Sequence, residues 1–174
     1  MLTRAVAGGG RCIIMIHNAV AMSYEDMTAF VRSGIPDNVR IISITDLDAD
    51  LIFQNESDRV LTFAFDDVEP TDMSGVTSSP AKYRLFSRAD ASRIVQAIQR
   101  WHAEDTPLSL MVNCMAGVSR SAAVCEFAYR VCGINSEIFK RDNPIRFPNG
   151  HVLRLLVRES NSRTRPHKVL SEDT

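Results

Sequence analysis

Four short apolar runs, rich in β-branched residues, alternate along the chain with longer stretches of helical periodicity. Nearly continuous hydrophobic runs of this length are typical of strands in a parallel sheet that is covered on both faces. The four predicted strands are residues 12–16, 39–44, 60–65 and 108–113. Their alternation with helical segments predicts an α/β fold around a central, mostly parallel sheet of about four to five strands flanked by helices.

Helix-start signals stand between the predicted strands. Two serine–aspartate pairs with capping-box spacing open apolar helical stripes: Ser23 with Asp26, and Ser87 with Asp90. Residues 121–132 are apolar on nearly every side, so we expect a helix that is buried in the middle of the fold. Asn149 is predicted to cap a last helix over residues 150–159.

A chain of 174 residues fits one compact domain. We expect a single domain over residues 11–160, with flexible termini at 1–10 and 161–174. The segment 69–80 is polar and holds two prolines and a glycine, which predicts a mobile surface loop.

Charge and cysteine usage exclude several classes of protein. The formal net charge is −1, so the chain as a whole shows no nucleic-acid-binding footprint. Its apolar runs are far shorter than a bilayer span, so we expect no membrane segment. The first residues lack an apolar signal core, and the four cysteines are therefore expected to be reduced thiols in a cytoplasmic protein. No metal-ligand spacing is present, and neither a metal nor a cofactor is expected.

One segment combines residue types that suit phosphate chemistry. Residues 113–122 read NCMAGVSRSA and join the fourth predicted strand to the buried helix. A strand–loop–helix junction directs several backbone N–H groups at one point, where the helix dipole adds positive charge. Gly117 allows the tight turn, and Arg120 offers two parallel donors to a phosphoryl group. The predicted phosphate-binding residues are Met115, Ala116, Gly117, Val118, Ser119 and Arg120.

Cys114 lies at the base of this predicted loop, where the positive field favours a nucleophilic thiolate. Ser121 is placed to donate a hydrogen bond to the sulfur and to stabilise it as a leaving group. For Cys114 alone, a buried structural cysteine is the favoured interpretation, with Arg120 as a surface ion-pair partner. The complete segment favours the phosphate site, because that interpretation explains all of its residues together.

The segment NCMAGVSRSAA resembles the signature of protein tyrosine phosphatases, in particular the small dual-specificity-type enzymes, whose loop reads His-Cys-x-x-Gly-x-Ser-Arg-Ser. Residues 65–70 (FDDVEP) resemble the family's general-acid loop, and 147–153 (FPNGHVL) resemble the Pro-Asn segment that opens its last helix. The resemblance covers roughly residues 38–157. It implies a phosphatase-like catalytic domain that hydrolyses phosphomonoesters through a cysteinyl-phosphate. The implied substrates are phosphotyrosine proteins, with phosphoserine and phosphothreonine or small phosphomonoesters as further options.

Asn113 departs from this family pattern, because the family nearly always has histidine before the cysteine. That histidine helps to organise the loop and to tune the thiolate, so Asn113 leaves a second function open. The alternative is a phosphate-binding module with little turnover. The chain retains the nucleophile, arginine, serine and acid candidates, and these favour the enzyme.

Two neighbouring residues compete for the general-acid role. Aligning Phe63 and Phe65 with the family's strand favours Asp67 over Asp66. Side-chain alternation puts the two carboxylates on opposite faces, so at most one of them faces the loop.

Three histidines are weaker candidates for the site than the residues of the loop. His17, followed by Asn18, comes after the first predicted strand, at the edge where α/β ligand sites lie, and is favoured as a rim residue. His102 is expected on a helix surface, and His151 is a possible substrate contact.

Overall fold

The computed structural model describes residues 16–69 and 83–164 and has a four-stranded sheet at its centre. The strands lie in the order β1-β4-β2-β3, and each neighbouring pair is parallel. The bounds are β1 Ile16–Met22, β2 Val39–Thr45, β3 Val60–Ala64 and β4 Leu108–Asn113. The expected α/β fold around a mostly parallel sheet is therefore confirmed. All carboxyl ends of the strands point to one edge of the sheet.

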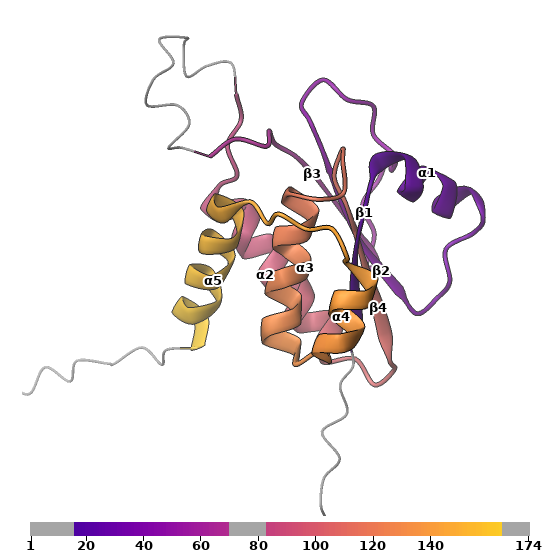
Figure 1. Cartoon of the computed structure of the whole chain (residues 1–174), viewed down its shortest axis with the longest axis vertical. Helices are drawn as coiled ribbons and strands as arrows, with labels where there is room; N and C mark the ends of the chain where they lie inside the picture. The colour runs from indigo at the N-terminus through magenta and orange to yellow at the C-terminus, as the bar shows by residue number, and fades with distance from the viewer. Residues whose placement is uncertain (1–15, 70–82, 165–174) are drawn as a thin grey trace, which may run out of the picture.

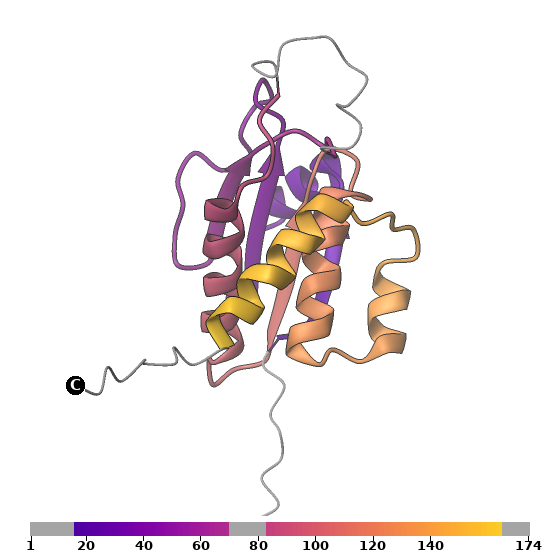
Figure 2. The same cartoon turned by 90° about the vertical axis from the view of Figure 1, so that its left-hand side faces the viewer.

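Helices cover both faces of the sheet (Figures 1 and 2). One face carries α1 alone, whereas α2, α3 and α5 lie against the other, and α4 packs beside β1. The bounds are α1 Tyr24–Arg32, α2 Arg88–His102, α3 Arg120–Cys132, α4 Ser136–Asp142 and α5 Gly150–Thr164. As expected for an all-round apolar segment, α3 is almost wholly buried between its neighbours.

The predicted caps form hydrogen bonds at three helix starts. Ser23 Oγ accepts from the Asp26 backbone N–H at 3.1 Å at the start of α1. Ser87 and Asp90 form the reciprocal capping box at the start of α2. The Asn149 Oδ1 atom accepts from the Val152 N–H at 3.0 Å in the first turn of α5. These contacts satisfy backbone donors that a helix start leaves without intrahelical partners.

The first strand differs from its prediction. It runs over Ile16–Met22, whereas the run predicted as a strand, 12–16, lies outside the described residues except for Ile16. The reason is that β1 is an edge strand, which tolerates exposed polar positions such as His17. His17 and Asn18 therefore lie at the start of β1, at the opposite edge of the sheet from the one proposed for them.

Two helices also differ. The sequence did not predict α4 as a separate element; Asn135 caps it by accepting from the Glu137 and Ile138 N–H groups. The last helix, α5, continues to Thr164, beyond its predicted end at 159 and into the expected flexible terminus. An ion pair between Arg163 and Glu159 at 3.0 Å supports this additional turn. Most of the predicted 69–80 loop lies outside the described residues.

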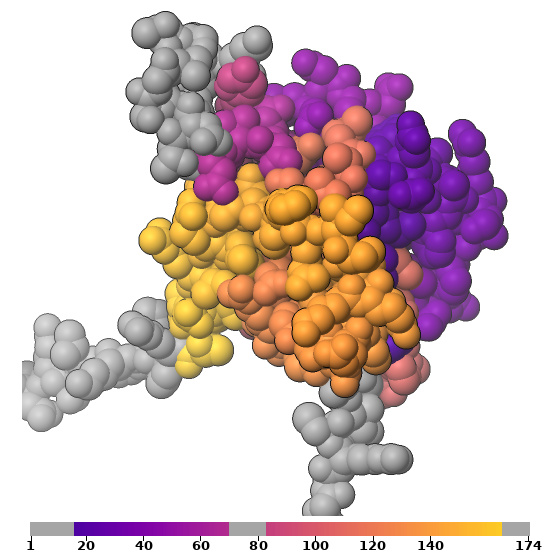
Figure 3. All heavy atoms as spheres, viewed as in Figure 1, coloured from indigo at the N-terminus to yellow at the C-terminus, as the bar shows by residue number. Residues whose placement is uncertain are grey.

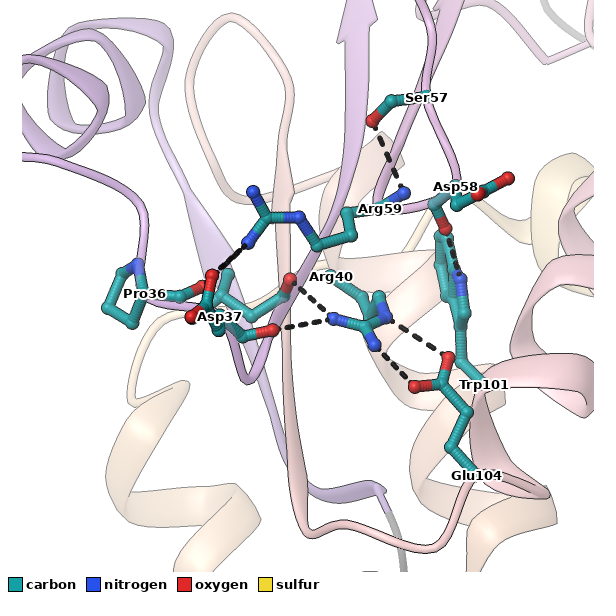
Figure 4. Close-up of polar contacts among 9 residues, drawn as sticks. Pro36, Asp37, Arg40, Ser57, Asp58, Arg59, Trp101 and Glu104 are labelled. Atoms are coloured by element: carbon teal, nitrogen blue, oxygen red, sulfur yellow. Dashed lines mark hydrogen bonds and ion pairs between the residues drawn. The ribbon is translucent and has the colours of Figure 1, made fainter.

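A polar network fixes the end of the sheet opposite the carboxyl edge (Figure 4). Arg40, near the start of β2, is largely buried and makes a two-pronged ion pair with Glu104, just after α2. The fully buried Trp101 donates its indole N–H to the Asp58 carbonyl at 2.8 Å. These contacts join the end of α2 to the start of β2 and to the segment before β3. No helix within residues 16–69 and 83–164 has the length and apolar character needed to cross a membrane.

Candidate active site

The loop 114–119 lies at the carboxyl end of β4, the strand flanked by β1 and β2. It packs directly against the end of β1. Cys114 N–H donates to the Met22 carbonyl at 3.2 Å, and Tyr24 N–H donates to the Met115 carbonyl at 3.1 Å. Gly117 has a φ of +78°, and a Cβ there would lie 2.6 Å from backbone atoms of Met22 and Ser23. This position therefore requires glycine for both its conformation and its space.

Cys114 and Ser121 meet at the base of this loop. The Cys114 Sγ atom lies 3.1 Å from the Ser121 Oγ atom, and both side chains are buried. Ser121 belongs to the first turn of α3, whose N-terminal end carries the positive pole of the helix dipole. The predicted contact between the Cys114 sulfur and the Ser121 hydroxyl is present.

Arg120 opens α3 with its guanidinium turned inward and only 3% exposed. Its Nη1 atom donates to Asp46 Oδ1 and to the Phe65 carbonyl, each at 2.6 Å. Its Nε atom has no hydrogen-bond partner within residues 16–69 and 83–164, although Asp67 Oδ2 lies 3.8 Å away. One side of the guanidinium is thus fixed, whereas the Nε donor faces Asp67 without a hydrogen bond among the described residues.

Asp46 is a site residue that sequence reasoning missed. It directly follows β2, which lies beside β4 in the sheet, so its carboxylate lies at the edge that holds the loop. Its position at the carboxyl end of a parallel strand was the only signal in the sequence.

The two candidate acids point to different neighbours. Asp67 Oδ1 accepts from Ser119 Oγ and from Asn149 Nδ2, each at 2.8 Å, so it lies beside the loop. Asp66 Oδ2 instead accepts from the Arg84 N–H at 2.8 Å. The structure therefore brings Asp67 together with Arg120 and directs Asp66 toward the segment before α2.

The start of α5 holds the segment that carries Asp67. Asn149 caps this helix with its oxygen and contacts Asp67 with its nitrogen. Glu69 accepts from the Gly150 and His151 N–H groups and pairs with Arg154. Partial burial raises the pKa of Glu69, but the hydrogen bonds from Gly150 and Arg154 outweigh it and hold that pKa below its usual range. Sequence reasoning assigned Asn149 only the capping role.

Asn113, the residue before Cys114, is fully buried at the end of β4. Neither its amide nitrogen nor its amide oxygen finds a hydrogen-bond partner in the part of the chain that the structure describes. The side chain thus makes no bond to the loop of the kind that a loop-organising residue would provide.

The remaining candidates lie apart from the loop. His151 Nε2 lies 2.9 Å from the Phe86 carbonyl, a contact within the protein that occupies this nitrogen. The His102 Nδ1 atom accepts from the Ile16 backbone N–H at 3.4 Å at the start of β1, at the far edge of the sheet. The described cysteines, Cys114, Cys125 and Cys132, are free thiols. Among the described residues, no group of three or more His, Cys, Asp and Glu side chains has a metal-binding arrangement.

Comparison with known proteins finds likeness at the level of structure. No protein-family model matches the sequence, and no curated protein matches it. Human DUSP28 is 19% identical, with a TM-score of 0.47, over 86% of this chain and 95% of that chain. OH1 from the Orf virus, titled a tyrosine phosphatase with triple substrate specificity, is 14% identical, with a TM-score of 0.42, over 84% of this chain and 81% of that chain. These likenesses concern the fold and assign no activity.

Proposed function

We propose that this protein hydrolyses phosphomonoesters through a cysteinyl-phosphate intermediate. The observation that carries the proposal is the buried Cys114 Sγ atom, 3.1 Å from Ser121 Oγ at the N-terminal end of α3. The start of α3 also carries the inward-turned Arg120. A thiol, a hydroxyl donor and a guanidinium at one helix N-terminus suit nucleophilic attack on a bound phosphate dianion.

The phosphate dianion is bound by the backbone amides of residues 115–120 and by the Arg120 guanidinium. Asp46 and the Phe65 carbonyl hold Nη1, which keeps the guanidinium in one orientation. The Nε donor, which makes no hydrogen bond within the described residues, then serves as one of two parallel donors to phosphoryl oxygens. Substrate binding gives the Nε donor the hydrogen bond that it does not make within residues 16–69 and 83–164.

In the first step, the Cys114 thiolate attacks phosphorus in line, forming the S–P bond as the P–O bond to the leaving group breaks. Asp67 gives its proton to the departing oxygen. In the second step, Asp67 takes a proton from water, whose oxygen attacks phosphorus and releases the sulfur. Ser121 donates a hydrogen bond to the departing thiolate. The contacts from Ser119 and Asn149 hold the Asp67 carboxyl beside the loop for both steps.

Phosphorylated protein is the proposed substrate class, with phosphotyrosine first and phosphoserine or phosphothreonine second. Met115, Ala116 and Val118 make the loop apolar, and it has no lysine. This composition disfavours highly charged inositol polyphosphates, whose additional phosphates need further cations. We also propose that the protein acts in the cytoplasm and without a metal or cofactor.

A phosphate-binding module with little turnover is the second candidate function. The observation that favours it is Asn113, whose buried amide makes no hydrogen bond to the loop among the described residues. In such a module the amides and Arg120 bind phosphate, while the thiolate lacks the support that rapid turnover requires.

Turnover of p-nitrophenyl phosphate separates these functions. We expect Cys114→Ser to lose at least about a thousandfold in turnover while it retains affinity for tungstate, because the amides and Arg120 remain. Cys132→Ser is the matched control, because burial raises the pKa of the Cys132 thiol to about 12 and keeps it neutral. A Cys114→Ser protein with wild-type turnover contradicts the mechanism. Tungstate binding by a wild-type protein without turnover establishes the binding module instead.

A further inference from the structure

Two large apolar side chains are exposed beside the candidate site. Phe147 is 75% exposed and Ile145 is 66% exposed, the highest fractions among large hydrophobic residues that the structure describes. Single exposed apolar residues are ordinary on protein surfaces. Here, however, two of them lie in one short connection between α4 and α5.

Arg146, between these two residues, turns inward. Its Nη1 atom donates to the Asn143 carbonyl at 3.0 Å, and its guanidinium lies over the Phe139 ring, 5.1 Å from the ring centre. The charged residue of the connection is therefore bound to the protein, whereas Ile145 and Phe147 face solvent. We call these two residues the apolar shelf.

The apolar shelf adjoins the loop that binds phosphate in our proposal. The Phe147 N–H donates to the Val118 carbonyl at 2.7 Å, and the Asn149 N–H donates to the Ser119 carbonyl at 3.2 Å. Figure 1 shows the connection passing across the N-terminal end of α3, and Figure 3 shows it at the surface of this side of the molecule. Within the loop, Met115 is also 38% exposed. The hydrogen bonds from Phe147 and Asn149 thus place the shelf directly beside residues 118 and 119 of the loop.

The backbone under the shelf is fixed before any ligand binds. Pro144 and Pro148 flank residues 145–147 and restrict their backbone. The hydrogen bonds from the Phe147 and Asn149 N–H groups anchor this segment to the loop. A surface that is already ordered loses little conformational entropy on binding, which favours its use in recognition.

We infer that the apolar shelf binds a large apolar side chain that flanks the phosphorylated residue of a polypeptide substrate. The inference rests on the proposed function and narrows its substrate class to phosphorylated polypeptides with an apolar neighbour. The two backbone hydrogen bonds to the loop favour this occupant, because they hold Phe147 next to the place where the phosphorylated residue binds in our proposal. A stable contact with a second copy needs on the order of 1,000 Å² of buried surface, more than two side chains supply.

The test compares kcat/KM for pairs of phosphotyrosine peptides that differ only by leucine or serine, scanned over the positions flanking the phosphotyrosine. We expect the wild type to prefer leucine about tenfold at one position or more. The double variant Ile145→Ser, Phe147→Ser is expected to lose that preference. Val131→Ser is the matched control and retains it. Val131 is 43% exposed near the far end of α3, about 16 Å along the helix from the loop.

Each outcome decides the inference separately from the proposed function. Equal kcat/KM for leucine and serine peptides at every position overturns the proposed binding role of the shelf and leaves the phosphatase proposal intact. If no peptide is hydrolysed, the proposed function fails, and binding of the same peptide pairs to the Cys114→Ser protein, measured by fluorescence anisotropy, still decides for or against the shelf. A double variant that dissociates a dimer without changing peptide preference assigns the shelf to contact between copies and overturns the inference.

Discussion

Arg120 lies between two carboxylates in this site. Asp46 contacts its Nη1 atom at 2.6 Å, and Asp67 lies 3.8 Å from its Nε atom. A guanidinium that is 3% exposed needs such partners, because a buried charge without them is costly. The two carboxylates have different surroundings, since Asp67 also accepts hydrogen bonds from Ser119 and Asn149. We therefore propose that Asp46 orients Arg120 and that Asp67 transfers the proton.

The assignment of Asp67 predicts a dependence on the leaving group. Asp67→Asn is expected to lose about a hundredfold or more in kcat on phosphotyrosine, because a poor leaving oxygen needs the proton. The loss is expected to shrink for aryl phosphates with good leaving groups. Asp66→Asn is the matched control, since Asp66 bonds to the Arg84 backbone instead. A leaving-group dependence in Asp66→Asn, with Asp67→Asn near wild type, reverses the assignment.

Asn113 predicts a change in thiolate reactivity. With no hydrogen bond from Asn113 to the loop in the described structure, the Cys114 thiolate depends on the helix dipole and Arg120. Asn113→His is therefore expected to raise the rate of iodoacetate inactivation of Cys114. The measurement is the inactivation rate of both proteins at pH 7. An unchanged or lower rate in Asn113→His shows that Asn113 already supports the thiolate as well as histidine does.

The site contacts that the sequence predicted join residues close together in the chain, whereas the contacts that it missed join residues far apart. Cys114 and Ser121 are seven positions apart, and one continuous motif contains both. Asp46 contacts Arg120 across 74 positions, and Asn149 contacts Asp67 across 82. Only the packing of strand ends and helix starts creates such contacts. A single sequence carries no periodicity or spacing that reveals them.

At the scale of elements, the two central strands and the edge strand β3 were predictable from the sequence, and the edge strand β1 was not. The runs at 39–44 and 108–113 agree closely with β2 and β4, because strands covered on both faces are almost wholly apolar. β1 mixes apolar and polar residues at the edge of the sheet, whereas the more apolar residues 12–16 just before it have the pattern that predicts a strand. The short helix α4 has seven residues, too few for a clear apolar stripe.

Substitution of Gly117 tests how closely the loop between β4 and α3 packs against β1. Gly117→Ala is expected to weaken tungstate binding and turnover by about a hundredfold or more, because the new Cβ would meet backbone of Met22 and Ser23 at 2.6 Å. Gly133→Ala is the matched control. Gly133 also has a positive φ, of +66°, but no atom lies within 4 Å of the added Cβ.

For Gly133→Ala we expect a loss of about 1 kcal/mol in the free energy of unfolding, with unchanged turnover. Tungstate titration, p-nitrophenyl phosphate turnover and urea denaturation of both variants provide the comparison. Wild-type tungstate affinity in Gly117→Ala contradicts the close packing of the loop on β1.

At the scale of the whole molecule, buried and paired carboxylates link stability to pH. Burial raises the pKa of Asp90, but hydrogen bonds from Ser87 and the contact with Arg84 outweigh it and hold that pKa below its ordinary value of 3.8. The folded state therefore favours the charged form. The stabilisation is present above the pKa of the unfolded chain and is lost as pH falls through the lower folded value.

Asp90→Asn is accordingly expected to lower the free energy of unfolding by about 1–2 kcal/mol at pH 7. Between pH 5 and pH 2, the free energy of unfolding of this variant is expected to fall less than that of the wild type. Asp26→Asn is the matched control from the capping pair of α1, where the carboxylate is exposed, and a smaller effect is expected there. Urea denaturation at several pH values provides the comparison. Parallel pH curves for wild type and Asp90→Asn contradict this role of Asp90.

The central claim is that the Cys114 sulfur receives the phosphoryl group. The most direct measurement is mass spectrometry of the peptide that contains Cys114, after rapid quenching of the enzyme during turnover of p-nitrophenyl phosphate. We predict a phosphoryl adduct on Cys114 in the wild type and its absence in Cys114→Ser. Asp67→Asn is expected to retain the adduct longer, because activation of water is slower. Steady turnover with no adduct on Cys114, and the same rate in Cys114→Ser, would contradict the claim.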